Sequence, residues 1–505
     1  LLDDAELARV RRAAAAWHEA RGQIATALRY LTLAGDGPAL AAALERHGGA
    51  LLAAGESATV LAALAAVPEA DRGPALDLVE GEACQVRGDW ERALACLSRL
   101  IPPEGPAPAA AAWRLGVIHH LRGEPTRALD HYRRGLADGD AAPRDRAMCG
   151  AWGAAAAWLL GDVARCRELV AAAHRDAERA DDHAAWAAVH TAHALIAALD
   201  GDRRANDRHY LRALDHARRA GDVLAQIRIG VNRGSRLLEE GHYVEAIAEL
   251  DTAITLADLA GFAALRTLAL VNRGEAARWL GRLEEAERDL TAALTEARRL
   301  GSSVAGYALC DLGDVHFDQG NLAQAAVCYE QAVALLEPTG DLQGLVPSWS
   351  GLAVLRAEDD PAAAQELADR AVRSEPTLGH TRALLAAGWV ALARGEREEA
   401  RRYADRAAEV AGEQLARAGV AEAEELRAGA EPDPRTAVAV LRRAVARWEE
   451  LSCPVPRARA RLALARRLGG PEALAICDEV ERECRERGAR RLVAQAAALR
   501  AELAR

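Results

Sequence analysis

The chain has 505 residues, a formal net charge of -11 and an isoelectric point near 5.8, and it contains no lysine. The acidic balance argues against direct contact with nucleic acid, because nucleic-acid-binding domains usually carry a basic face. Strand-favouring β-branched and aromatic residues are too scarce for a large sheet, and no apolar run of 18 or more residues suggests a membrane span. The composition therefore predicts an all-α protein, which we place in the cytoplasm.

The first 68 residues predict a few irregular helices with short glycine turns and no regular repeat. Their start lacks both the basic residues and the uninterrupted apolar core of a signal peptide. Because the only Met is Met148, we also expect the chain to be part of a longer polypeptide. We treat residues 1–68 as a helical linker that caps the repeats of residues 69–505.

From residue 69 onward, a glycine is followed seven residues later by a second glycine, and five residues after that by an alanine. The longest near-identity is between "VNRGSRLLEEGHYVEAIAEL" and "VNRGEAARWLGRLEEAERDL", which begin 40 residues apart. The turn glycines recur at intervals of 35 to 40 residues. Complete copies begin at six glycines: Gly81, Gly116, Gly234, Gly274, Gly313 and Gly388.

This pattern predicts antiparallel helix pairs. The first glycine lies inside helix A, where it costs about 1 kcal/mol and persists when a neighbouring helix must approach closely. The second glycine ends helix A in the left-handed conformation, and we expect the alanine of helix B to face the first glycine. Helix B is extended in three copies, up to breaks at Gly221, Gly261 and Gly301.

The repeat resembles the tetratricopeptide repeat (TPR), although its spacing exceeds the usual 34 residues. The resemblance implies a right-handed α-solenoid, and we expect eleven to thirteen helix pairs after residue 70. The proline-rich segment from Pro102 to Pro108 is predicted to be a loop between repeats. A short turn is predicted within Ala428 to Thr436.

The two ends resemble the TPR sensor region of MalT-like and large LuxR-type regulators, which are STAND ATPases. The closing stretch beginning "AVLRRAVARWEEL" is similar to the repeats that precede their helix-turn-helix. Residues that match the joint between ATPase and repeats are Trp17, Ala27, Leu28, Ala34, Gly35, Asp36, Leu44, Leu51, Leu52, Gly55, Glu56, Leu64 and Pro68. The resemblance implies an ATPase and a DNA-binding part outside this chain, since no phosphate-binding P-loop exists without lysine. The repeats alone also fit activators with another DNA-binding module, and ATPase–TPR proteins fused to cyclases or kinases.

No catalytic constellation is evident, so we do not expect an enzyme, a cofactor or a metal site. His190 and His193 lie on one helical face, but no third ligand follows from the spacing. The nine cysteines form no CxxC pair, and we expect buried free thiols.

Candidate ligand contacts come from the register of the A helices. Asn232 and Asn272 lie two residues before the mid-helix glycine, and the row they belong to is Trp152, Ala192, Asn232, Asn272, Asp311 and Trp349. In TPR solenoids this face lines the concave groove, where amides suit a peptide backbone or ligand hydroxyls and tryptophans supply flat walls. The alternative is that the two asparagines only tie neighbouring repeats together.

Three further residues complete the candidate groove: Arg233, Arg273 and Trp279. The arginines are expected in a charge network with Glu239, Glu240, Glu284 and Glu285, with an anion site as the alternative.

Two functions follow from these features. The chain is either the sensor of a bacterial transcriptional regulator, which binds a small effector, a peptide or an inhibitory protein in its groove, or a scaffold for a partner peptide or helix without a small-molecule effector. No membrane partner is expected. Self-association is also expected, because terminal repeats expose apolar seams.

Overall fold

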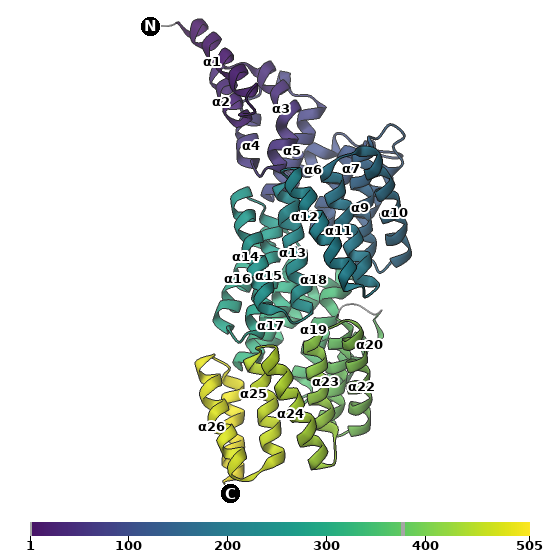
Figure 1. Cartoon of the computed structure of the whole chain (residues 1–505), viewed down its shortest axis with the longest axis vertical. Helices are drawn as coiled ribbons and strands as arrows, with labels where there is room; N and C mark the ends of the chain where they lie inside the picture. The colour runs from purple at the N-terminus through teal and green to yellow at the C-terminus, as the bar shows by residue number, and fades with distance from the viewer. Residues whose placement is uncertain (1–2, 375–378, 505) are drawn as a thin grey trace. The chain divides into compact units, whose positions relative to one another are not determined.

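The computed structural model describes residues 3–374 and 379–504, which form 27 α-helices, two 3-10 helices and no strand (Figure 1). The predicted fold class is confirmed: antiparallel helix pairs stack as a TPR-like α-solenoid. The first half contains α1 (Asp4–Glu19), α2 (Ile24–Ala34), α3 (Gly37–Ala53), α4 (Ser57–Ala65), η1 (Glu69–Asp71), α5 (Pro74–Arg87), α6 (Trp90–Ser98), α7 (Ala109–Arg122), α8 (Pro125–Leu136), α9 (Pro143–Leu159), α10 (Val163–Ala180), α11 (His183–Leu199), α12 (Arg203–Arg219) and α13 (Val223–Glu239). The second half contains α14 (Tyr243–Ala260), α15 (Ala263–Trp279), α16 (Leu283–Leu300), α17 (Val304–Gln319), α18 (Leu322–Leu336), η2 (Glu337–Thr339), α19 (Leu342–Arg356), α20 (Pro361–Arg373), α21 (His380–Ala393), α22 (Arg397–Glu413), α23 (Arg417–Ala430), α24 (Pro434–Glu450), α25 (Pro454–Leu468), α26 (Gly470–Glu486) and α27 (Arg490–Leu503).

The helices group into two compact units. Unit 1 comprises Leu1–Gly230 and Thr252–Arg266, and unit 2 comprises Val231–Asp251 and Thr267–Arg505. The boundary cuts α13, α14 and α15, which are the repeats with the longest shared sequence. From α5 onward the described helices make eleven pairs and one final helix, within the expected number.

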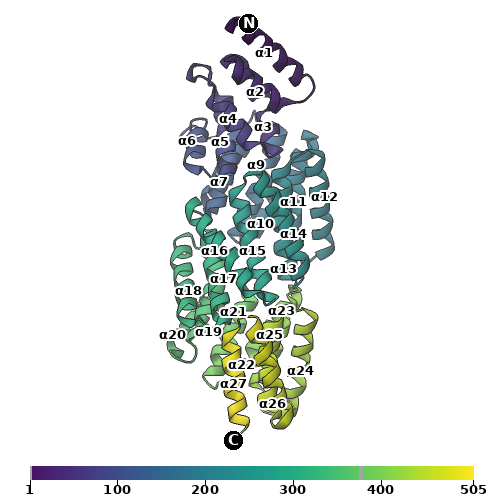
Figure 2. The same ribbon diagram turned by 90° about the vertical axis from the view of Figure 1, so that its left-hand side faces the viewer.

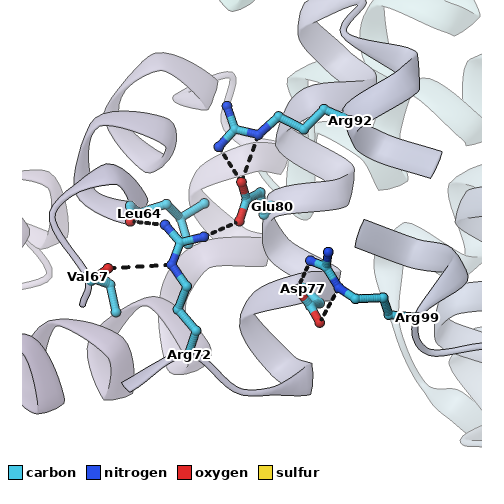
Figure 3. Close-up of polar contacts among 7 residues, drawn as sticks. All are labelled: Leu64, Val67, Arg72, Asp77, Glu80, Arg92 and Arg99. Carbon is cyan, nitrogen blue, oxygen red and sulfur yellow. Dashed lines mark hydrogen bonds and ion pairs between the residues drawn. The ribbon is translucent and has the colours of Figure 1, made fainter. Parts of the chain in front are cut away.

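A buried glutamate holds the first repeat to the segment that precedes it. Glu80 on α5 accepts a 2.8 Å hydrogen bond from Arg72 and two from Arg92 on α6 (Figure 3). Arg72 also donates to the carbonyls of Leu64, at 2.7 Å, and Val67. These bonds satisfy carbonyls at the end of α4 and fix α4 against α5 and α6. The boundary at residue 68 stays a prediction.

The turns between paired helices form as their sequence predicts. Gly281 and Gly320 have φ of 72° and 81°, a conformation that glycine adopts at little cost. The next helix often begins at a capping aspartate: Asp162 and Asp202 each accept from a backbone N–H three residues ahead, at 2.9 Å. The helix pairs run alongside each other in both views (Figures 1 and 2). Both predicted loops, after α6 and after α23, are confirmed.

The helix B alanine is expected to face the helix A glycine, and the Ala286 carbonyl oxygen does lie 3.3 Å from a Cβ atom added to Gly274. The glycine also makes room for a large side chain four residues after that alanine. A Cβ atom on Gly274 would lie 2.7 Å from Leu290, and one on Gly313 would lie 2.5 Å from Tyr329. The alanine permits close backbone approach, and the glycine provides the hole for the larger side chain.

The C-terminal helices of unit 2 contact earlier repeats of the same unit. A Cβ atom on Gly241 would lie 2.7 Å from Leu451, and one on Gly281 would lie 2.6 Å from Pro454. Helix α27 also contacts α17. Unit 2 therefore contains contacts between repeats that are far apart in the sequence.

All nine cysteines are free thiols, as expected, and eight of them are buried while Cys328 is half-buried. Among the described residues, no helix has the length and apolar character needed to cross a lipid bilayer.

Candidate functional site

Three A helices of unit 2 present one polar side chain each at the same register. Asn232 on α13, Asn272 on α15 and Asp311 on α17 lie two residues before a mid-helix glycine, and all three are half-buried. Their side chains make no hydrogen bond to any other residue that the structure describes. The hydrogen bond that would tie Asn232 to Asn272 is therefore not formed, and the donors and acceptors of all three side chains remain available.

Asp311 lies in crowded surroundings of mixed charge. Burial, with Glu275 on α15 and Asp314 on its own helix adding repulsion, holds the pKa of Asp311 well above its ordinary value. Burial also raises the pKa of Glu275, which accepts a 3.4 Å hydrogen bond from the Trp279 indole. A positively charged group would relieve the repulsion between these carboxylates.

Asp314 is the centre of a buried ion network that joins three A helices. It accepts hydrogen bonds from both terminal nitrogens of Arg382 on α21, at 2.9 and 2.5 Å, and from the Tyr329 hydroxyl at 2.6 Å. Arg278 on α15 lies 3.6 Å from Asp314 and donates to Asp318 at 3.0 Å. Although burial opposes ionisation, Arg382 and Arg278 hold the pKa of Asp314 below its ordinary value.

A second buried pair lies on the next A helices. Glu425 on α23 accepts two 3.0 Å hydrogen bonds from Arg459 on α25, and a further one from the indole of Trp448 on α24. Its side chain is 2 % exposed. The charged side chains around Asp314 and Glu425 thus belong to formed networks, in contrast to the three positions described above.

Arg233 and Arg273 are engaged in ion pairs with carboxylates of the B helices. Arg233 donates to Glu249 at 2.8 Å, and Arg273 forms a two-pronged pair with Asp289 at 2.7 and 2.8 Å. Glu249 and Asp289 lie 16 residues after their arginine, on helix B of the same repeat, and Arg273 also donates to Asp251 on α14 at 2.6 Å, which joins it to the preceding repeat. The carboxylates that pair with these arginines are not among the glutamates predicted for the charge network, which are Glu239, Glu240, Glu284 and Glu285. Glu240 pairs with Arg236 instead.

The tryptophans expected to wall the groove are packed against other side chains. Trp349 is 4 % exposed within an apolar cluster and lies under Arg370, so it does not line an open surface. Trp279 stacks between Tyr243 and Trp448, with ring centroids 5.6 and 6.0 Å apart. Trp349 is thus buried by packing that the repeat register cannot reveal, whereas Trp279 stays half-buried and its place in the groove stays a prediction.

Trp152, on α9, belongs to unit 1. Its ring lies 4.1 Å below the guanidinium carbon of Arg228 and meets the ring of His120 edge-on. It is half-buried.

His190 and His193 belong to a six-histidine cluster on three helices of unit 1. His193 lies 3.1 Å from His174 on α10, and His190 lies 3.2 Å from His209 on α12. His183 and His216 form the third close pair, at 3.0 Å. Within residues 3–374 and 379–504, no group of three or more His, Cys, Asp or Glu is arranged to hold a metal ion.

The sequence interpretation missed Glu275, Asp314, Arg278 and Arg382. A signal was present, because Glu275 and Asp314 each directly follow the mid-helix glycine of their repeat. Arg382 could not be found this way, because its partner lies 68 residues earlier.

Comparisons with known proteins support the repeat assignment. Residues 265–337 match the tetratricopeptide repeat family, and no curated protein matches the chain. Similar solved structures include yeast Tom70 (13% identity over 83% of this chain and 95% of that chain, TM-score 0.37). Another is a signal transduction ATPase with numerous domains (STAND) protein with a tetratricopeptide repeat sensor from Pyrococcus horikoshii (14%, 69% and 48%, TM-score 0.38). A third is a Rap protein complexed with competence and sporulation factor (14%, 81% and 99%, TM-score 0.38).

Proposed function

We propose that this chain is the sensor module of a larger bacterial transcriptional regulator and that it binds a peptide segment on the A helices of unit 2. The observation that carries this proposal is the row of Asn232, Asn272 and Asp311. Three half-buried polar side chains at one register keep unused hydrogen-bonding groups, while neighbouring charged side chains form networks. Unused polar groups in such surroundings cost free energy unless a ligand or water satisfies them.

The chemistry of the row favours a peptide with a basic group. Each asparagine offers two donors and one acceptor, which match the alternating N–H and C=O groups of an extended backbone. Asp311 and Glu275 repel each other, so a lysine, an arginine or an amino terminus would gain by approaching them.

The regulatory role follows from the resemblance of the chain ends. Binding would favour one of two arrangements of the solenoid relative to an ATPase elsewhere in the same polypeptide, and only differential affinity for those arrangements can shift their balance. A reading frame that encodes no ATPase beside this chain would contradict the regulatory part and leave a peptide-binding scaffold.

Peptide binding can be tested with an array of random 12-residue peptides probed with the full chain, followed by titration of the best binders. The variant Asn232→Ala/Asn272→Ala removes the two amides, and we expect an affinity loss of roughly 10-fold or more, since each hydrogen bond contributes about 0.5–1.5 kcal/mol. Asn321→Ala is the matched control, because its amide lies at a turn and donates to Gln319 at 3.1 Å. Equal binding by all three proteins would contradict the assigned site.

A further inference from the structure

Arg228, on the part of α13 that belongs to unit 1, has no carboxylate partner. Among the described residues it makes no ion pair and no side-chain hydrogen bond, and its Nε atom is buried. Its guanidinium carbon instead lies 4.1 Å from the centre of the Trp152 ring, a cation–π contact. This differs from Arg233, on the same helix, and from Arg273, on α15, which are both paired with carboxylates.

Two more polar atoms without partners lie around the same tryptophan. The Nδ1 atom of His120 on α7 and the hydroxyl of Tyr132 on α8 are both buried and have no hydrogen-bond partner among the described residues. The His120 ring centroid lies 5.5 Å from that of Trp152. Tyr132 is fully buried and packs beside Gly153, the residue after Trp152. Four helices of unit 1 therefore bring these groups into one cluster, in which Trp152 packs against the apolar residues around Tyr132 and Arg228 acts electrostatically on both His120 and Tyr132.

The protonation states make this group one cation with two neutral neighbours. Burial lowers the pKa of Arg228 to about 10, so its guanidinium stays charged at neutral pH. Burial, with Arg228 adding to it, lowers the pKa of His120 to about 4, and burial raises that of Tyr132. At neutral pH Tyr132 is therefore a hydroxyl donor, and His120 is a neutral imidazole that donates from Nδ1 in one tautomer.

Asp222 is the acidic group that acts most strongly on Arg228, but it forms no ion pair with the arginine. Its carboxylate instead caps α13 by accepting from the Ala225 N–H at 2.8 Å. Burial also raises the pKa of Asp222, which disfavours its charged form. Arg228 is half-buried, and the burial of its unpaired Nε atom is unfavourable unless an anion or water completes the hydrogen bonding of the guanidinium.

We propose that Arg228, Tyr132 and His120 form a binding site in unit 1 for a singly charged oxyanion, with Trp152 as its flat wall. A carboxylate or a phosphate monoanion suits this chemistry. A guanidinium binds either anion through two parallel hydrogen bonds, and its single positive charge balances the single negative charge of the anion. This site is separate from the peptide site proposed in unit 2, and neither depends on the other.

The test is a titration of the full chain with sodium acetate and, separately, inorganic phosphate, followed by calorimetry at pH 7 and at ionic strength held constant with sodium chloride. We expect Arg228→Gln and Tyr132→Phe each to weaken binding at least about 10-fold, as for the loss of one hydrogen bond to a charged group. Arg167→Gln is the control, since Arg167 is exposed on α10 and paired with Asp200.

The two salts distinguish the sources of the oxyanion. Binding of acetate alone identifies a carboxylate site, and binding of phosphate alone identifies a phosphate site. Tyr132→Phe removes a single oxygen, so it keeps the proposal testable if Arg228→Gln does not fold; circular dichroism and the melting temperature verify folding. The proposal is wrong if neither anion binds more tightly than chloride, or if the folded variants bind both anions as the unmodified chain does.

Discussion

Asp311 and Asp314 lie one helical turn apart on α17, yet their surroundings shift their pKa values in opposite directions. Arg382 and Arg278 hold the pKa of Asp314 below its ordinary value in spite of its burial. Asp311 has no hydrogen-bond partner among the described residues, and burial together with Glu275 raises its pKa. We therefore expect the ionised Asp314 to stabilise unit 2 and the ionised Asp311 to cost it stability.

We predict that Asp311→Asn stabilises unit 2 at pH 7 by on the order of 1 kcal/mol. The native carboxyl has a raised pKa, so its unfavourable contribution grows as pH rises from the unfolded value near 3.8 to the native pKa, stays constant above the native pKa and vanishes below 3.8. The gain measured by urea denaturation should therefore be largest at pH 7–8 and disappear near pH 4. Asp314→Asn is the matched control and should destabilise at pH 7; a destabilising Asp311→Asn would show that Asp311 is a structural residue.

Within a helix pair, the mid-helix glycine is needed because a large side chain fills the space above it. Tyr329 occupies the hole beside Gly313, and its hydroxyl is fixed by the hydrogen bond to Asp314. The ring therefore cannot move away without breaking that bond. The repeat pattern predicted the glycine and the close helix contact, but not which side chain fills the hole, because the filling residue varies between Leu and Tyr.

We expect Gly313→Ala to lower the free energy of unfolding by about 2 kcal/mol, since overpacking a core typically costs ~1–3 kcal/mol. Gly412→Ala, also in a helix but with nothing within 4 Å of the added Cβ, should raise it by about 0.5 kcal/mol through helix propensity. Urea denaturation of both variants measures the difference. Equal effects of the two substitutions would mean that the contact with Tyr329 is not tight.

We expect the six histidines on α10, α11 and α12 to lower the stability of this part of unit 1 as the pH falls. Burial, with His209 and other cations adding to it, lowers the pKa of His190 to about 3 and that of His193 to about 4. In each close pair one ring must stay neutral to accept the hydrogen bond of the other. Sequence spacing found only His190 and His193, because the other partners lie on different helices.

Because folding lowers these pKa values, the unfolded chain takes up protons first as pH falls. Above about pH 6.5 the neutral histidines cost the folded chain no stability. As the pH falls from that value to pH 3–4, protonation of the unfolded chain progressively lowers the free energy of unfolding. We predict that His190→Gln reduces the loss of unfolding free energy between pH 7 and pH 5 by roughly 1–2 kcal/mol. Urea denaturation of the full chain at the two pH values measures this loss. His242→Gln, outside the cluster, should leave the loss unchanged; the same loss in both variants would contradict the prediction.

At the scale of the whole molecule, sequence periodicity predicts contacts between neighbouring repeats only. The pairs, their turns and the extended B helices were all predictable, because each depends on residues fewer than about 40 apart. The stacking of Trp279 on Trp448, the bond of Arg382 to Asp314 and the contact of Leu451 with Gly241 were not, because they depend on how repeats of unit 2 curve back on one another. These distant contacts set the surroundings of the candidate site residues, which the repeat pattern does not predict.

Such contacts should change how unit 2 unfolds. A solenoid with only neighbour contacts opens locally, repeat by repeat, whereas Trp448 on α24 is fully buried and stacks on Trp279 of α15 at 6.0 Å. We predict that Trp448→Ala, a core truncation that typically costs ~3–5 kcal/mol, reduces amide hydrogen-exchange protection in α15 as well as in α23–α25. Val480→Ala, a buried truncation on α26, is the control and should leave α15 protected. If exchange in α15 is unchanged in Trp448→Ala, the distant contact does not couple the repeats, and unit 2 unfolds as a chain of independent neighbours.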